Sequence, residues 1–225
     1  MRLERRSSVV EQGTHKPLVG SSNLPAATSA QDAVRRHRPR KVMTQPRTSL
    51  TDPLPILPVL PAPGAGRIGI TFCPGKIDPA ATPAPWRRDL AADLDAIRDW
   101  RAAAVVTLVE TRELDMLGVP DLGAQVARRG MAWFHLPIVD MAVPDAAFET
   151  RWVHAGAALR ALLVDGRDIV VHCRGGLGRA GTIAARLLVE FGVAPDDAIR
   201  IVRRARPGAI ETVAQENHVR GLRPG

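Results

Sequence analysis

The ten-residue stretch HCRGGLGRAG, residues 172–181, constrains the fold of this chain more than any other segment. The residues before it, 168–172, are mostly β-branched and follow an Asp-Gly pair, which predicts a buried strand entered through a tight turn. Apolar residues then recur at helical spacing over 179–191 and stop at Gly192, which predicts an amphipathic helix. The stretch is therefore predicted to be a glycine-rich turn from a strand into a helix.

This turn is predicted to bind an anion. Glycine permits backbone angles that direct successive N–H groups at one point, and a helix N-terminus attracts negative charge. Neither the dinucleotide-binding nor the Walker A pattern is matched, so the glycines serve another chemistry. We expect the anion to be held by the loop residues Arg174, Gly175, Gly176, Leu177 and Gly178 and by Arg179, whose guanidinium would bind it.

Cys173 and Arg179 are the candidate catalytic residues of the turn. The loop N–H groups, the helix dipole and the guanidinium would stabilise a Cys173 thiolate. Arg179 can offer two parallel N–H donors to a phosphoryl group. His172 can hydrogen-bond within the turn and help to set the ionisation of the nucleophile. The alternative for Cys173 is a buried, unreactive cysteine at the end of a strand.

The pattern His-Cys-x5-Arg resembles the phosphate-binding loop of cysteine-dependent protein tyrosine and dual-specificity phosphatases. Together with GRIGITFCPGKI, HLPIVDMAVPD and RPGAIETVAQ, it is similar to the kinase-associated phosphatase branch over about residues 66–222. The resemblance implies attack by a thiolate, a phosphocysteine intermediate and its hydrolysis by water. It also implies that no metal or organic cofactor is used and that a phosphorylated protein is the substrate.

Such a reaction needs an acid that protonates the leaving group. By the resemblance, Asp140 aligns with the movable acid of the family, and a turn-forming role is the alternative. Asp145 directly precedes a predicted helix over 146–164 and is better placed as its N-cap. We therefore expect Asp140 to be the general acid.

Other residues near these segments have two interpretations each. By the resemblance, Thr212 and Gln215 lie near the phosphate loop and order the hydrolytic water; the alternative is that they cap the last helix. Cys73 is either a core thiol, which we favour, or the partner of Cys173 in a reversible disulfide. Relatives usually carry Ser or Thr directly after the loop arginine, whereas this chain has Ala180.

The order of predicted elements indicates an α/β fold. Strands alternate with helices, including one expected over 86–101, which predicts a single three-layer domain with a four- to five-stranded, mostly parallel sheet flanked by helices. The phosphatase domain is expected over 67–222. Residues 51–66 are rich in proline and predict an extended linker.

Residues 1–50 predict a basic, disordered tail. They contain 10 Lys and Arg against 3 Asp and Glu, so they carry seven of the eight net positive charges. Codons compatible with parts of this segment resemble a tRNA gene, so residues 1–42 are expected to be a spurious extension upstream of Met43; a real basic arm is the alternative. The tail lacks a signal-peptide core, and prolines interrupt the longest apolar stretch, so we expect a cytoplasmic protein without a membrane segment.

The site residues favour a phosphomonoesterase. By the resemblance, phosphotyrosine is the expected substrate, followed by phosphoserine or phosphothreonine. The alternatives are a phosphoinositide or RNA 5′-phosphatase and a non-catalytic phosphoprotein-binding module. Because the excess charge lies in the tail, no nucleic-acid partner is expected for the domain. The sequence does not indicate an oligomeric state.

Overall fold

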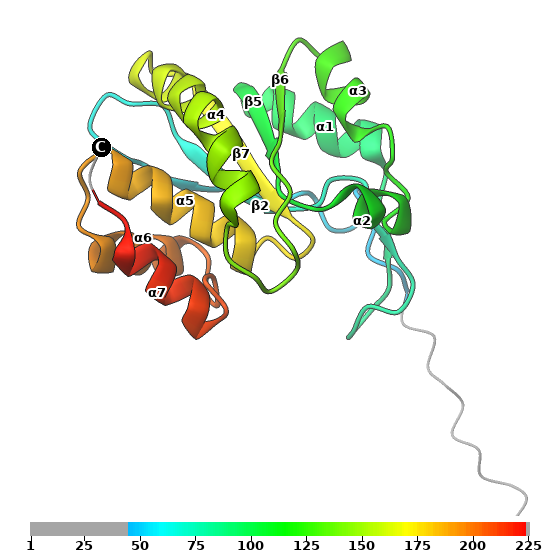
Figure 1. The fold of residues 1–225 in the computed structure, drawn as a ribbon. Helices are drawn as coiled ribbons and strands as arrows, with labels where there is room; N and C mark the ends of the chain where they lie inside the picture. The colour runs from blue at the N-terminus through cyan, green and yellow to red at the C-terminus, as the bar shows by residue number, and fades with distance from the viewer. Residues whose placement is uncertain (1–44, 224–225) are drawn as a thin grey trace, which may run out of the picture. The chain divides into compact units, whose positions relative to one another are not determined.

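A computed structural model of the chain describes residues 45–223, which belong to one compact unit. The predicted spurious extension, residues 1–42, lies outside the described residues, as does all of the predicted basic tail except 45–50. The unit consists of a central sheet with helices on both faces (Figure 1). The predicted α/β fold with three layers is confirmed.

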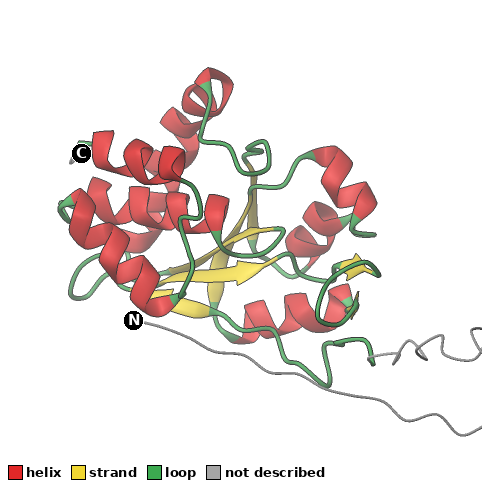
Figure 2. Ribbon diagram, turned by 90° about the horizontal axis from the view of Figure 1, so that it is seen from below, coloured by secondary structure: helices red, strands yellow, loops and turns green. Residues whose placement is uncertain are grey.

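The central sheet has five strands in the order β1-β2-β7-β5-β6. Only β1 is antiparallel to its neighbour, and the other adjacent pairs are parallel, as predicted. Figure 2 shows the strands enclosed between helices. The strands are β1 (Leu57–Val59), β2 (Ile68–Phe72), β5 (Ala102–Thr107), β6 (Ala132–His135) and β7 (Asp168–Cys173).

Two groups of helices cover the sheet (Figure 1). Helices α1 and α3 contact β5 and β6 on one face, whereas α4 and α5 contact β7 on the other, with α6 and α7 packed on α5. The helices are α1 (Leu90–Asp99), α2 (Thr111–Met116), α3 (Leu122–Arg128), α4 (Ala146–Val164), α5 (Gly178–Glu190), α6 (Pro195–Ala205) and α7 (Val213–Gly221).

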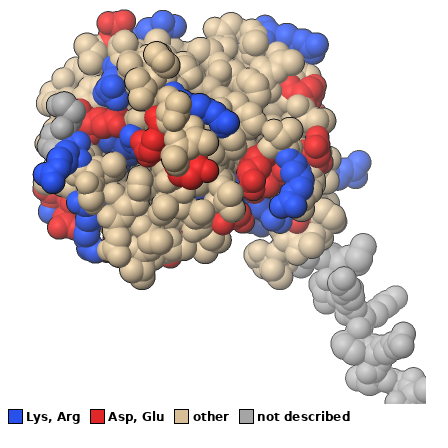
Figure 3. Space-filling model, in the orientation of Figure 1, with Lys and Arg blue, Asp and Glu red and all other residues tan. Residues whose placement is uncertain are grey.

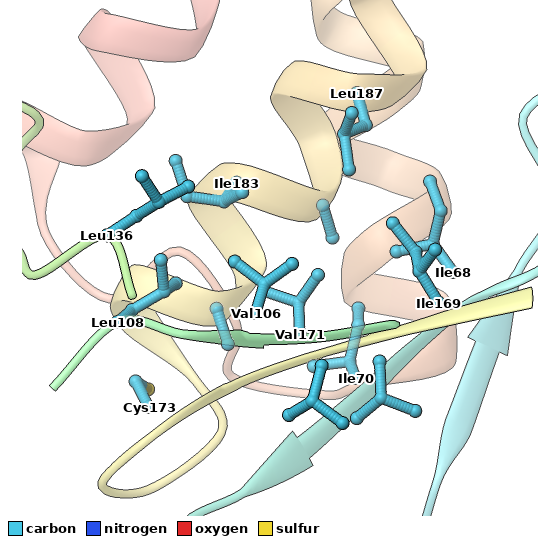
Figure 4. Close-up of a cluster of buried hydrophobic side chains, with 14 of the residues drawn as sticks. Ile68, Ile70, Val106, Leu108, Leu136, Ile169, Val171, Cys173, Ile183 and Leu187 are labelled. Atoms are coloured by element: carbon cyan, nitrogen blue, oxygen red, sulfur yellow. The ribbon is translucent and has the colours of Figure 1, made fainter. Parts of the chain in front are cut away.

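Strand β7 lies at the centre of the core. Its residues Ile169, Val170 and Val171 are fully buried, because a strand covered on both faces needs apolar side chains on both. Ile183 and Leu187 of α5 pack toward the strands (Figure 4). The core therefore fixes the end of β7, where Cys173 lies, relative to the start of α5.

The structure differs from the expected helix over 86–101. Residues 86–87 form β4 (Trp86–Arg87), which pairs with β3 (Ile77–Asp78), and α1 begins only at residue 90. Asp89 caps α1 by accepting a hydrogen bond from the Ala92 N–H. The hydrophobic pattern extended the predicted helix too far because Trp86 is buried by a strand pair instead.

The proline-rich segment 51–66 also differs from the expected linker. It contributes β1 to the sheet, and Leu54 and Val59 are buried in the core. Pro58 is tolerated because β1 is an edge strand, where one side of the backbone needs no partner. Much of this segment is therefore part of the folded unit.

On the face shown in Figure 3, basic and acidic side chains lie beside one another, in keeping with the nearly balanced charge of residues 51–225. Among residues 45–223, no helix combines the length and the apolar character needed to cross a membrane.

Candidate active site

Cys173 is the last residue of β7 and is almost fully buried. Figure 4 shows it where the strand leaves the apolar core and enters the loop that leads to α5. The strand fixes the Cys173 backbone, since Phe72 of β2 pairs with it in register. The thiol is thus placed at the carboxyl end of a parallel strand, the usual location of ligand sites in such sheets.

The loop between β7 and α5 leaves four backbone N–H groups, those of residues 174–177, without an acceptor in the described part of the chain. Its carbonyls are all bonded. Within a planar trans peptide the C=O and the next N–H point in opposite directions, so fixing the carbonyls on one side turns N–H groups to the other. This is the arrangement of an anion-binding nest, and Gly176 supplies the left-handed residue (φ +68°) that it needs.

Distant side chains hold the loop carbonyls. The Arg206 guanidinium donates to the carbonyls of Gly175 and Gly176, both at 3.1 Å. The Lys76 ammonium donates to the carbonyl of Arg174 at 3.2 Å, and burial lowers the pKa of Lys76 to about 8. The loop conformation is therefore set from outside, by residues that the sequence motif does not contain.

Arg179, at the start of α5, is buried and held by a carboxylate. Both its terminal nitrogens donate to Glu113 of α2, with Nη2–Oε1 at 2.9 Å, and Nη1 also donates to the Ile138 carbonyl at 3.0 Å. Burial opposes the ionisation of both groups, but these bonds prevail: the pKa of Glu113 is lowered and that of Arg179 raised. The guanidinium is thus fixed and charged.

One nitrogen of this guanidinium has no partner among residues 45–223. Nε of Arg179 is buried and bonded to nothing in the described part of the chain, while Nη2 is shared between Glu113 and the Oδ1 atom of Asp140, 2.9 Å away. Nε and Nη2 form the edge of a guanidinium that receives oxyanions side by side. An anion bound there would complete the coordination of Nε and compete with Asp140 for Nη2.

The two candidate acids occupy different places. Asp140 pairs with Arg179 and is about half exposed, so it lies at the site and can exchange protons with solvent. Asp145 accepts a hydrogen bond from the Phe148 N–H at 2.7 Å and is the N-cap of α4. The capping role expected for Asp145 is confirmed, and the structure brings Asp140 together with Arg179.

His172 is bonded across the sheet. It is fully buried, and its Nε2 atom lies 2.8 Å from the Thr107 hydroxyl of β5, which also accepts from Trp133. The Thr107 hydroxyl oxygen accepts the hydrogen bond from the Trp133 N–H. Its own hydrogen can therefore be donated to Nε2 of His172. Burial lowers the pKa of His172 to about 3, so the ring is neutral at physiological pH.

Thr212 and Gln215 form a capping box at the start of α7, which was one of the two expectations. The Thr212 hydroxyl accepts from the Gln215 N–H at 3.1 Å, and the Gln215 side-chain oxygen accepts from the Thr212 N–H at 3.3 Å. The Gln215 side chain also donates to the Ala142 carbonyl. The pair thereby connects α7 to the segment that carries Asp140.

Cys73 is a buried thiol on the neighbouring strand end, and burial raises its pKa well above the usual range. Both cysteines are free, buried thiols in the structure. The burial of Cys73 fits the core role that we favoured, and a reversible disulfide with Cys173 stays an untested alternative.

Several residues of the site were not found from the sequence. Glu113, Arg206 and Lys76 hold Arg179 or the loop, yet they lie 30 or more residues away from their partners in the chain. The Glu211 carboxylate accepts a hydrogen bond from the N–H of Gly178 at 2.7 Å, across 33 residues of sequence. Gly178 therefore differs from the other predicted cradle residues, since its N–H already has an acceptor.

A cavity of about 210 Å³ lies beside the loop. Arg174 and Glu113 line it together with apolar residues, and the Arg174 guanidinium is held at its edge by Asp78 at 2.8 Å. The apolar lining includes Ile77, Met116 and Leu117. The cavity thus continues from the anion site onto an apolar surface.

The family described as Swiss Army Knife protein, DSP-PTPase phosphatase domain (PTP-SAK), matches residues 87–219, which is more than half of the chain. Cyclin-dependent kinase inhibitor 3 of Sus scrofa is 31% identical over 140 residues, covering 61% of this chain and 65% of that protein. The chain thus spans slightly less than two thirds of the length of this relative. Protein tyrosine phosphatase type IVA 3 of Bos taurus is 28% identical over 130 residues, covering 57% of this chain and 69% of that protein.

A solved structure is similar over a larger share. The crystal structure of kinase-associated phosphatase, with its catalytic-site cysteine substituted by serine, superposes with a TM-score of 0.65 at 26% identity. The match covers 74% of this chain and 92% of that chain. The similarity therefore includes nearly the whole of that phosphatase.

Proposed function

The chain belongs to the DSP-PTPase phosphatase family, and we propose that it hydrolyses phosphomonoesters through a phosphocysteine intermediate. The observation that carries this proposal is the set of unpaired donors around Cys173. Four loop N–H groups and the Nε atom of Arg179 lack acceptors among the described residues, and all belong to the segment that follows the thiol. Preorganised donors of this kind stabilise the charge of a phosphoryl group during transfer.

In the first step the Cys173 sulfur attacks phosphorus, so an S–P bond forms as the P–O ester bond breaks. The departing oxygen takes a proton from Asp140, which becomes a carboxylate. Arg179 and the loop N–H groups bind the phosphoryl oxygens throughout. Because burial and the contact with Glu113 fix the guanidinium, little reorganisation is needed when substrate arrives.

Asp140 pairs with Arg179 in the free protein. A phosphate dianion that binds Nε and Nη2 would replace this contact, so substrate binding would free the Asp140 side chain to approach the leaving oxygen.

In the second step water attacks phosphorus, the S–P bond breaks and the sulfur leaves as a thiolate. The Asp140 carboxylate accepts a proton from the attacking water, which restores the acid, and inorganic phosphate departs. His172 contacts Thr107 across the sheet, and the Gln215 side chain lies against Gly178 of the loop and donates to the Ala142 carbonyl. The role of Thr212 and Gln215 in ordering the hydrolytic water stays a prediction.

Phosphorylated proteins are the proposed substrates, with phosphotyrosine first and phosphoserine or phosphothreonine next. Support comes from the relatives, one of which is named a protein tyrosine phosphatase. The apolar cavity beside Arg174 also suits a peptide side chain next to the phosphorylated residue. A phosphoinositide and an RNA 5′-phosphate, assayed beside phosphopeptides, test the alternative substrate classes.

The experiment that tests the proposal is hydrolysis of p-nitrophenyl phosphate in EDTA. The full chain should release p-nitrophenol, and Cys173→Ser should lose at least about a thousandfold in kcat while still binding tungstate, because the loop donors remain. Activity in the serine variant equal to that of the parent would show that Cys173 is not the nucleophile. Absence of turnover on every phosphoester, with tungstate still bound, would indicate a phosphoprotein-binding module instead.

A further inference from the structure

The carboxylate of Glu211 already occupies part of the proposed phosphate cradle. Its Oε2 atom accepts a hydrogen bond of 2.7 Å from the N–H of Gly178, the first residue of α5. In the preceding peptide, the Leu177 carbonyl bonds to the N–H of Gly181, inside the helix. The Gly178 N–H therefore points out of the helix N-terminus, on the side of the loop N–H groups that await an anion.

The segment before Glu211 is held against the loop. The N–H of Ile210 lies 3.4 Å from the Leu177 carbonyl, and Arg203 donates to the carbonyls of Ala209 and Ile210. Ile210 adopts a left-handed conformation (φ +60°), which is costly for a β-branched residue and must be imposed by its surroundings. This strained residue directly precedes Glu211 and helps to direct its side chain toward Gly178.

The carboxylate lies close to the loop backbone. A Cβ atom at position 178 would lie 2.6 Å from Oε2 of Glu211 and 2.9 Å from the side-chain amide atoms of Gln215, so both side chains would have to shift. Glu211 as a residue is exposed, and its Oε2 atom is the part that contacts the loop.

The negative charge of Glu211 has no cationic partner. The hydrogen bond from Gly178 is the only interaction that its side chain makes in the described part of the chain, and no Lys, Arg or His lies within ion-pair distance. Glu216, five residues later in α7, differs, since it pairs with Arg203 and Arg220. Glu211 also does not cap α7, because Thr212 is the N-cap.

We propose that Glu211 is a resident anion that sets the affinity of the phosphate site. This inference rests on the proposed function, because it needs the loop to bind phosphate. A phosphoryl dianion in the cradle must either displace the carboxylate from Gly178 or lie beside it, and both weaken binding. The carboxylate therefore limits the affinity for inorganic phosphate, the product, and favours its release after each turnover.

The experiment is calorimetric titration of the full chain with tungstate and with inorganic phosphate. Glu211→Gln removes the charge but keeps an oxygen that can accept from Gly178, so we expect it to bind both anions at least about tenfold more tightly than the parent. Glu216→Gln is the matched control: it makes the same change of charge five residues later, in α7, and should change the affinity less than twofold. Glu211→Ala also removes the charge and replaces the glutamine variant if that one does not fold.

The outcomes separate the two proposals. Equal affinity in the parent and in the Glu211 variants would overturn the role of Glu211 and leave the proposed phosphatase function intact. Failure of every variant, parent included, to bind either anion would overturn both, because the cradle itself would be absent. Equally tighter binding by Glu211→Gln and Glu216→Gln would attribute the effect to net charge and would also overturn the role of Glu211.

Discussion

His172 is a neutral residue next to the proposed nucleophile, and this has a consequence for stability. Burial lowers the pKa of the folded His172 to about 3, whereas an unfolded histidine titrates near 6.5. Below pH 6.5 the unfolded chain therefore binds a proton that the folded chain does not. The free energy of unfolding should therefore decrease as the pH is lowered, by about 2 kcal/mol between pH 6.5 and pH 5.

Denaturant unfolding at several pH values measures this effect. The variant His172→Gln keeps an acceptor for Thr107 but cannot be protonated, so its stability should depend less steeply on pH over the same interval. Burial also lowers the pKa of His218, so the difference in slope between parent and variant, and not the parent's slope alone, is the relevant quantity. Identical slopes would contradict the burial of a neutral His172.

We expect Ala180 to weaken the stabilisation of the leaving thiolate in the proposed second step. Ser or Thr is usual after the loop arginine of the family, and its hydroxyl bonds to the leaving sulfur; Ala180 is buried and has no hydroxyl. Thr182 does not replace it, because its hydroxyl donates to the Gly178 carbonyl at 2.8 Å. A lost bond to a charged group of about 1.5–3 kcal/mol would slow hydrolysis of the intermediate by about ten- to a hundredfold.

Rapid-mixing kinetics with p-nitrophenyl phosphate should therefore show a burst of p-nitrophenol followed by slow turnover. Ala180→Ser should raise kcat without a matching gain in kcat/KM, which reports only the steps up to the phosphoenzyme. If the parent shows no burst, or if the serine variant is no faster at saturation, another group already stabilises the sulfur.

At the scale of elements, the phosphate loop depends on a clamp from the segment between α6 and α7. Arg206 bonds two successive loop carbonyls, those of Gly175 and Gly176. Arg206→Lys keeps the charge but has one nitrogen in place of the fork, so it cannot hold both carbonyls in the same way. We expect tungstate affinity and kcat/KM to fall by about tenfold, because the loop N–H groups are no longer fixed.

The control for the clamp is Arg204→Lys, the same change at an exposed position two residues earlier, whose side chain makes no hydrogen bond or ion pair in the described part of the chain. Thermal unfolding should show both variants folded with similar melting temperatures. Equal anion affinity in the Arg206 variant and the parent would show that the loop keeps its conformation without the clamp.

The strand, loop and helix around Cys173 could be predicted because their signals are local. The apolar run of β7, the glycines and the helical periodicity of α5 all lie within about 25 consecutive residues. The groups that support the site could not be predicted in this way. Glu113 lies 66 residues before Arg179, and Glu211 lies 33 residues after Gly178, so only the folded sheet brings them together.

At the scale of the whole molecule, the folded unit includes more of the N-terminal region than the domain predicted over 67–222. Arg47 pairs its backbone with the segment around Trp86, and its guanidinium lies 3.4 Å from the centre of the Trp86 ring. The Asp52 carbonyl accepts from the buried Arg88, which also forms an ion pair with Asp93. Residues from 47 onward therefore complete the packing around α1 and the β3–β4 pair.

Two truncated chains test where the folded unit begins. A chain that starts at Met43 retains every contact described here, so it should match the full chain in melting temperature and in kcat/KM. A chain that starts at Gly66 loses β1, the buried Leu54 and Val59, and the Asp52 acceptor of Arg88. Burial of the two apolar side chains alone stabilises the fold by about 3–6 kcal/mol, so this chain should unfold at a much lower denaturant concentration.

Both truncated chains keep Cys173, Asp140 and Arg179, so any loss in the shorter one reports on folding. Strand β1 covers the free edge of β2, which in turn pairs with β7 and so supports the strand that carries the nucleophile. Without β1, the edge of β2 would be exposed and prone to pair with other chains. We therefore expect the Gly66 chain to aggregate as well as to lose stability, measurable by light scattering. A monomeric, fully stable Gly66 chain would show that residues 45–65 are dispensable and that the domain begins at β2. That result would support the linker predicted over residues 51–66.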